Sequence, residues 1–216
     1  DLTLDVLRGL AMALVVLGHA LIGVQAALGD NPISRFLIVL IYTTHMPVFF
    51  LLAGFLSHRL IGRDWRAFVT ALLVRILWPY LLWSTLFLLL HHLASEVTNT
   101  RVDAFRPVSI LWKPPAVMWF LYALFIAFIA ARILSPLGKG VTAAVGLGLV
   151  MLSYGVEMPF SQMRFIGVFL LARVLPNDAL ALAMENSIQR FACVVGLITM
   201  SLAWWLSSAP LQDYPA

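Results

Sequence analysis

Long apolar runs, separated by short polar segments, dominate this chain of 216 residues. Three of them cover residues 6–28, 36–56 and 69–90, and a fourth covers residues 116–133. A bilayer core about 30 Å thick requires roughly 20 apolar residues in helical conformation. Because a spanning segment must satisfy its backbone hydrogen bonds internally, these runs predict transmembrane α-helices.

Three weaker candidate spans follow, at residues 140–154, 159–175 and 191–206. The predicted fold is therefore all-α: a polytopic transmembrane bundle of about seven spans, forming one integral membrane domain over residues 1–216. Hydrophobic residues make up 62% of the chain and charged residues 11%, against about 45–50% and about 25% in soluble domains. A globule of this size cannot bury such an excess, which disfavours a soluble enzyme, a disordered chain and a nucleic-acid-binding domain.

Basic residues lie at the ends of the apolar runs, where they predict orientation in the membrane rather than a nucleic-acid surface. One side would carry Arg8, Arg59, Arg63, Arg66, Arg132, Lys139, Arg173 and Arg190, and the other Arg35, Arg101, Arg106, Lys113 and Arg164. The richer side is expected to be cytoplasmic. The N-terminus is then cytoplasmic, and the polar segment 91–114 lies on the outer side.

Ionisable side chains within apolar spans are candidates for function, because inserting a central arginine costs roughly 2.5–3.5 kcal/mol. Arg8 and His19 are eleven positions apart in the first span, almost three helical turns, so both point the same way. The turn at Pro32 would bring His19 and His45 to the same depth in a helical hairpin. Two histidines at one level suggest proton handling or substrate contact.

The third span combines Arg75 with Pro79, four positions later. Proline cannot donate a backbone hydrogen bond to the Arg75 carbonyl, so we expect a distorted helix at this point. Arg8 and Arg75 would both lie at the cytoplasmic end of the bundle. Guanidinium groups bind phosphate through two parallel hydrogen bonds, so this entrance favours a phosphorylated ligand.

Structural explanations stay open for these residues. His19 or His45 could serve only as a hydrogen-bonding group between helices, and Arg8 or Arg75 could reach the lipid headgroups.

His91 and His92 are adjacent and cannot share a helix face. His92 and Glu96, four positions apart, form a weak candidate for a metal pair, and no metal site is predicted. Trp119 could belong to an aromatic belt at the membrane interface. A purely structural explanation is harder to give for Arg164, because a second arginine, Arg173, lies nine positions later in the same apolar segment. The chain also carries no Gly-rich phosphate loop, GxSxG or HExxH motif.

Four ordered segments carry a resemblance to a known family: LDVLRGLA at 4–11 with His19-Ala20, HMPVFFLLAGF at 45–55, Arg66 with RILWPY at 75–80, and WFL at 119–121. Together they resemble the membrane-bound acyltransferase-3 family, and within it the sugar O-acetylases of the fucose 4-O-acetylase-like branch. The match is specific over residues 4–122 and becomes general from about residue 135 onward.

Members of this family move acyl groups, often acetyl, from cytoplasmic acyl-CoA to a carbohydrate or another acceptor at or beyond the membrane. The resemblance implies an integral O-acyltransferase of a bacterial inner membrane that uses acetyl-CoA or another acyl-CoA as co-substrate and needs no metal. Its expected partners are acyl-CoA, a carbohydrate or lipid-linked glycan acceptor and membrane lipids, but no nucleic acid. The resemblance also implies that His19 is the catalytic histidine, with Arg8 as its partner.

The candidate site assigns catalysis to His19, Arg8 and His45, acyl-CoA binding to Arg8, Arg75 and Arg66, and acceptor binding to Trp119 and Arg164. His19 would act as a general base on the acceptor hydroxyl, or as an acyl carrier.

Two other classes of protein stay open: a proton-coupled membrane carrier, and an inactive packing subunit. Because domains of the family are normally longer, a fragment or a shortened, inactive homologue is a further expectation to weigh.

Overall fold

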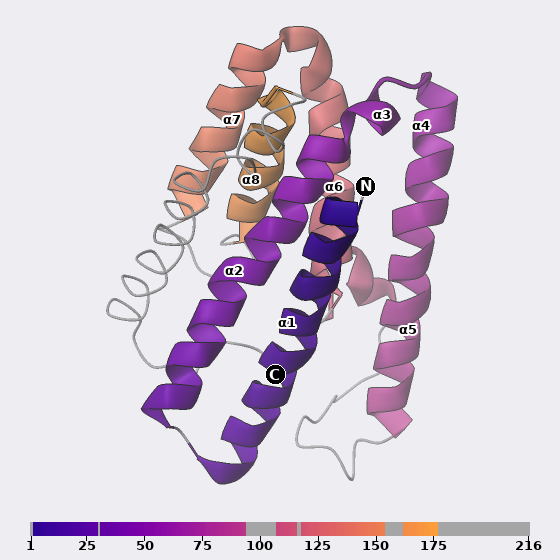
Figure 1. The fold of residues 1–216 in the computed structure, drawn as a ribbon. Helices are drawn as coiled ribbons and strands as arrows, with labels where there is room; N and C mark the ends of the chain where they lie inside the picture. The colour runs from indigo at the N-terminus through magenta and orange to yellow at the C-terminus, as the bar shows by residue number, and fades with distance from the viewer. Residues whose placement is uncertain (1, 30, 94–106, 116–117, 154–161, 177–216) are drawn as a thin grey trace, which may run out of the picture. The chain divides into compact units, whose positions relative to one another are not determined.

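The computed structural model describes residues 2–29, 31–93, 107–115, 118–153 and 162–176 (Figure 1). Within these ranges every regular element is helical, which confirms the all-α prediction. Two compact units form: Asp1–Leu56 with Leu171–Ala216, and Ser57–Leu170. The assignment of one domain to the whole chain stays a prediction.

The first unit contains a helical hairpin of α1 (Leu2–Leu28) and α2 (Pro32–Leu56), which pack against each other (Figure 1). Gly18 is buried on α1, and a Cβ atom added there would lie 3.0 Å from Cγ2 of Ile41 and 3.1 Å from Cε2 of Tyr42. A small residue therefore lets the two helices approach closely, as is common between helices in membranes.

The turn of the hairpin is set by residues suited to helix ends. Gly29 has φ +91°, a conformation that glycine adopts without strain, and its N–H donates to the Gln25 carbonyl at 2.9 Å. The side chain of Asn31 caps α2, because its Oδ1 accepts a hydrogen bond of 2.8 Å from the N–H of Ile33. The predicted break between the first two spans is confirmed.

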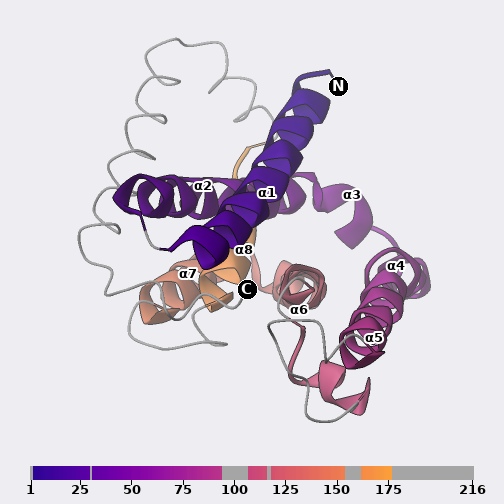
Figure 2. The ribbon, with the colours of Figure 1, turned by 90° about the horizontal axis from the view of Figure 1, so that it is seen from below.

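The second unit contains most of the remaining helices. These are α3 (His58–Ile61), α4 (Trp65–Leu72), the π-helical turn η1 (Leu73–Leu77), α5 (Trp78–Leu93), the 3₁₀ helices η2 (Pro107–Leu111) and η3 (Ser135–Leu137), α6 (Trp119–Leu134), α7 (Lys139–Leu152) and α8 (Met163–Val174). The last four residues of α8 belong to the first unit. α7 and α8 lie side by side (Figure 2), and Gly167 allows the contact, since a Cβ atom there would meet the Gly146 carbonyl oxygen at 2.5 Å.

In the part of the chain that the structure describes, four helices are long and apolar enough to cross a membrane: Gly9–Leu28, Pro32–Leu56, Trp65–Leu93 and Trp119–Leu137. They confirm the first four predicted spans. The third span begins at Trp65 rather than at residue 69, because Asp64 caps it by accepting a hydrogen bond of 3.0 Å from the Ala67 N–H. The fifth and sixth candidates correspond to α7, with 14 residues, and α8, with 12 residues. The seventh, residues 191–206, lies outside the described residues.

Large apolar side chains are exposed along the helix Trp65–Leu93. Val74, Trp78 and Trp83 are 62%, 62% and 53% exposed. Water-soluble monomers rarely expose contiguous apolar surfaces of this kind. The surface is the one expected of a helix that contacts lipid, in agreement with its length and apolar composition.

Pro79 lies directly after the π turn of this helix. The N–H of Trp78 bonds to the Leu73 carbonyl, five residues back, instead of a carbonyl four residues back. Proline lacks an N–H, and its ring conflicts with the carbonyl four residues earlier, which here belongs to Arg75. The predicted distortion at Arg75 is therefore present, as a π turn.

Arg132 of α6 joins three helices of the second unit. Its guanidinium group donates a hydrogen bond to the carbonyl of Ile61, the last residue of α3. Its Cζ atom also lies 5.7 Å from the ring centroids of both Trp65 and Phe68 on α4. Hydrogen bonding and cation–π attraction together hold α3 and α4 to α6.

Two tyrosines hold η2 in the second unit. The Tyr80 hydroxyl on α5 donates to the Ile110 carbonyl, and the Tyr122 hydroxyl on α6 donates to the Leu111 carbonyl at 3.1 Å. The two tyrosine rings are 5.6 Å apart, centroid to centroid. A short 3₁₀ segment is thus joined to two long helices through its own main-chain carbonyls.

Candidate active site

The two histidines of the hairpin, His19 and His45, both lie beside Tyr42. The ring centroids of Tyr42 and His19 are 6.0 Å apart, those of Tyr42 and His45 are 5.0 Å apart, and both pairs meet edge to face. The Tyr42 hydroxyl oxygen lies 3.4 Å from Nδ1 of His19. The two imidazoles therefore contact the same phenol ring from two different helices.

His45 is held by its own helix. It is only 2% exposed, and its Nδ1 lies 2.6 Å from the Ile41 carbonyl oxygen, one turn earlier. A carbonyl oxygen can only accept, so Nδ1 carries the hydrogen of this bond. In the neutral ring, Nε2 is then the nitrogen without a hydrogen.

The neighbouring threonines are also bound to α2. The hydroxyls of Thr43 and Thr44 donate to the carbonyls of Val39 at 2.7 Å and Leu40 at 2.6 Å. Such bonds satisfy polar side chains within one helix. Pro47 follows them, and α2 continues through it.

His19 differs from His45 in exposure and in its partner. Its side chain is exposed, and its partner at Nδ1 is a hydroxyl group, which can either donate or accept. A reactive imidazole needs an accessible nitrogen within reach of a substrate proton. His19 is therefore the histidine of this pair that a substrate could reach. Arg8 lies eleven positions earlier in α1, and its side chain lies outside the described part of the chain.

Tyr42 is the residue of this cluster that the sequence reasoning missed. If Pro32 is taken as the centre of the hairpin turn, His19 and His45 are equally far from it along the chain and should lie at the same depth. In the structure α1 ends at Leu28 and α2 begins at Pro32, so the centre of the turn is residue 30. Counted from there, His19 is level with residue 41, next to Tyr42. Counting from the centre of the turn signal would have found the tyrosine.

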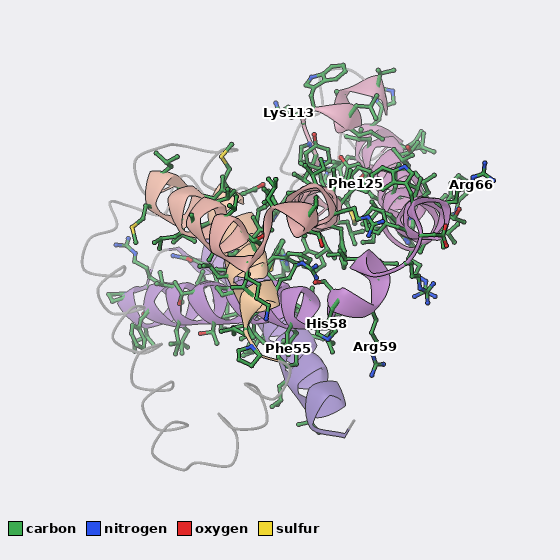
Figure 3. The ribbon with its side chains drawn as sticks, turned by 90° about the horizontal axis from the view of Figure 1, so that it is seen from above. Phe55, His58, Arg59, Arg66, Lys113 and Phe125 are labelled. Carbon is green, nitrogen blue, oxygen red and sulfur yellow. The ribbon has the colours of Figure 1, made fainter. Side chains whose placement is uncertain are left out.

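The two arginines predicted to bind acyl-CoA in the second unit are both exposed. Arg66 lies in the first turn of α4 and Arg75 lies in the π turn, nine positions later on the same continuous helix. Figure 3 shows the side chain of Arg66, like that of Arg59 on α3, directed away from its helix. The joint role of Arg66, Arg75 and Arg8 in binding acyl-CoA stays a prediction.

Trp119 and Arg164, the residues predicted to bind the acceptor, meet around Phe165. The Trp119 and Phe165 rings are 5.2 Å apart, centroid to centroid, and the Arg164 Cζ atom lies 5.4 Å from the centroid of the Phe165 ring. This aromatic–arginine cluster joins α6 to α8 and offers apolar ring faces beside hydrogen-bond donors. The sequence reasoning missed Phe165, although it directly follows Arg164 in the chain.

The weak metal candidate includes Glu96, which lies outside the described residues. Among the described residues, no three or more His, Cys, Asp or Glu side chains lie together in a way that could hold a metal ion. The ring of His91 contacts that of Phe87 at a tilt of 38°, with ring centroids 4.2 Å apart.

Comparisons with known proteins now identify relatives. A family model described as an acyltransferase domain matches residues 1–206. Nodulation protein NolL of Sinorhizobium fredii is 27% identical over 218 aligned residues, which cover 94% of this chain and 57% of that protein. Nodulation protein NolL of Mesorhizobium japonicum is 28% identical over 147 aligned residues, which cover 64% of this chain and 37% of that protein. The chain spans about half the length of the curated relatives that it matches, and no solved structure matches it significantly.

Proposed function

The chain belongs to the acyltransferase-3 family, and from this premise we propose that it transfers an acyl group from acyl-CoA to a hydroxyl of a carbohydrate or lipid-linked glycan. Acetyl is the proposed acyl group. The observation that carries the proposal is an exposed imidazole, His19, held beside a phenol and a second histidine within a hairpin of membrane-spanning length. We place the protein in a bacterial cytoplasmic membrane, where acyl-CoA is available on one side.

His19 would act as the general base. Its free nitrogen takes the proton of the acceptor hydroxyl while the oxygen bonds to the thioester carbonyl carbon. The carbon–sulfur bond then breaks, and coenzyme A leaves as a thiolate that receives the proton from the imidazolium ring. An acyl-histidine intermediate is the second route that would use the same residue, and trapping a labelled acyl group on His19 would identify it.

The two substrates would reach this base from opposite sides of the membrane. The exposed guanidinium groups of Arg66 and Arg75, with Arg8 of the hairpin, would bind the phosphates of acyl-CoA. The aromatic–arginine cluster of Trp119, Phe165 and Arg164 would bind the acceptor sugar. Ring faces suit the apolar face of a sugar, and a guanidinium group suits its oxygen atoms.

Transfer of labelled acetyl from acetyl-CoA tests the proposal, in membranes that contain equal amounts of the chain and its variants. We expect label in a glycan or lipid-linked fraction, and a loss of about 10²–10⁴-fold in His19→Ala, as for removal of a general base. Arg8→Ala should also lose transfer. His92→Ala is the matched control, because this histidine lies at the end of α5 and outside the hairpin.

Full transfer by His19→Ala would refute the assignment of the base. If no version transfers label, binding of acetyl-CoA separates the remaining classes. Binding without transfer would indicate that segments of a longer protein are needed, whereas no binding would favour a membrane carrier or a packing subunit.

A further inference from the structure

We propose that Tyr42 is a positioning residue for His19. The Tyr42 hydroxyl oxygen accepts the hydrogen on Nδ1 of His19, which leaves Nε2 of His19 as the basic nitrogen. This inference rests on the proposed function, in which His19 is the base. Its geometric basis is the distance of 3.4 Å between the Tyr42 hydroxyl oxygen and Nδ1 of His19.

The position of one hydrogen decides whether an imidazole can act as a base. A neutral ring carries a single N–H, and only its other nitrogen can take a proton. In His45 the Ile41 carbonyl oxygen, 2.6 Å from Nδ1, fixes the hydrogen on Nδ1, because this oxygen can only accept. His19 has a hydroxyl in the corresponding place, and this hydroxyl can fix the hydrogen in the same way by accepting.

An accepting hydroxyl suits both states of a working base. Before proton transfer, Nδ1–H of neutral His19 donates to the Tyr42 oxygen, and Nε2 faces the substrate. After transfer, the imidazolium ring carries hydrogens on both nitrogens, and Nδ1–H still donates to the same oxygen. The contact therefore persists through the step, as expected of a group that orients a base.

The surroundings of Tyr42 fix where its hydroxyl lies. On the α1 side, a Cβ atom at Gly18 would come within 3.1 Å of Cε2 of the Tyr42 ring, so α1 passes directly against the phenol. On its own helix, the buried ring of His45 meets Tyr42 edge to face at 5.0 Å. The phenol is thus held by the residue before His19 and by the second histidine.

Tyr42→Phe removes the hydroxyl and keeps the ring. We expect kcat to fall about 10–100-fold, the range seen when a group that orients a functional histidine is removed, while KM for acetyl-CoA stays unchanged. The matched control is Thr44→Val, which removes a hydroxyl two positions away that bonds only to the Leu40 carbonyl among the contacts described, at 2.6 Å. Transfer by this control should equal that of the wild type.

A second measurement does not depend on turnover. Nitrogen NMR of the full chain with labelled histidines reports which nitrogen of each of the five imidazoles carries hydrogen, and His19→Gln assigns the His19 signal. We expect the Nδ1–H form of His19 in the wild type and in Thr44→Val, and a mixture of both forms in Tyr42→Phe. Because the wild-type spectrum alone can show the Nε2–H form, the proposal can fail even if Tyr42→Phe does not fold.

The outcomes separate this inference from the proposed function. If neither acetyl transfer nor acetyl-CoA binding is found, the proposed function fails, and the NMR result still decides whether Tyr42 fixes the form of His19. An Nε2–H form in the wild type, or an unchanged form in Tyr42→Phe, would overturn the inference while leaving the acyltransferase proposal intact. A changed form with an undiminished kcat would also overturn it, since the contact would then have no part in catalysis.

Discussion

The hairpin α1–α2 and the unit Ser57–Leu170 differ in the groups that their interhelical polar contacts pair. In the larger unit, Arg132 and Tyr122 bond to main-chain carbonyls of other elements, those of Ile61 and Leu111. Each of these carbonyls lies at the end of a short helix, where the helix itself supplies no partner. Pairing these carbonyls joins the two short helices to α6, so these side chains stabilise the architecture.

The hairpin has no such need at the level of its histidines. α1 is regular around His19, and both helices continue past this level without a helix end. On α2 only the Thr43 carbonyl loses its helical donor, because Pro47 has no N–H. His19 and Tyr42 contact each other, and His45 bonds to a carbonyl of its own helix. The difference teaches that a polar group in a spanning segment is a functional candidate when the backbone around it is already satisfied.

Replacing His19 should therefore affect activity and leave stability unchanged. For His19→Gln we expect acetyl transfer to fall about 10²–10⁴-fold, as for loss of a general base. Because the side chain is exposed, the midpoint of thermal unfolding should stay that of the wild type. Unfolding in detergent, followed by circular dichroism beside the transfer assay, measures both. A large drop in the midpoint would show that the hairpin cluster is structural, like the contacts of the larger unit.

Replacing Arg132 should have the opposite effect. Arg132→Ala removes a charged hydrogen bond to the Ile61 carbonyl and cation–π contacts with Trp65 and Phe68. We expect a loss of about 2–4 kcal/mol in the free energy of unfolding. Transfer per folded molecule should be retained. Denaturant titration measures the stability.

Arg59→Ala is the control for this change, since Arg59 is exposed on α3 and should contribute less than about 0.5 kcal/mol. Equal stability of the Arg132 and Arg59 variants would contradict the structural role of Arg132. A loss of turnover by folded Arg132→Ala would instead place this arginine in the functional machinery.

The sequence was sufficient to predict the first four spans, and it supplied a candidate base that stays a prediction. Length and apolar character decide whether a helix can cross a bilayer, so the four long helices were predictable from composition. His19 could be proposed from the sequence because an ionisable side chain in a spanning helix is costly to insert and is therefore a functional candidate. The distortion at Arg75 followed from Pro79, although only the structure shows that it takes the form of a π turn.

Contacts between helices were harder to predict. Which residue faces His19 depends on where α1 ends and α2 begins, and a shift of one residue rotates a helical side chain by about 100°. Tyr42 was missed for this reason. Phe165 was missed because no local pattern indicates that α6 and α8 pair at Trp119.

The smallest predicted effect concerns the close approach of the two hairpin helices. Gly18→Ala would place a Cβ atom 3.0 Å from Cγ2 of Ile41 and 3.1 Å from Cε2 of Tyr42, tighter than ordinary van der Waals contact. Both neighbours are side-chain atoms, so they can shift by a few tenths of an ångström, and the stability should change by no more than about 1 kcal/mol. The shift moves the Tyr42 hydroxyl, so we expect kcat to fall about tenfold or less, since geometry at a base is sensitive to small displacements.

Gly23→Ala separates this steric effect from the general preference of helices for alanine. It lies on α1 with nothing within 4 Å of the added Cβ atom, so it should keep full transfer and gain up to about 1 kcal/mol from helix propensity. Both variants receive the same propensity gain, and only Gly18→Ala disturbs Tyr42. If the two variants transferred acetyl equally well, the hydroxyl of Tyr42 would tolerate displacement. The contrast between the proposed base of the hairpin and the structural contacts of Arg132 and Tyr122 would then rest on His19 alone.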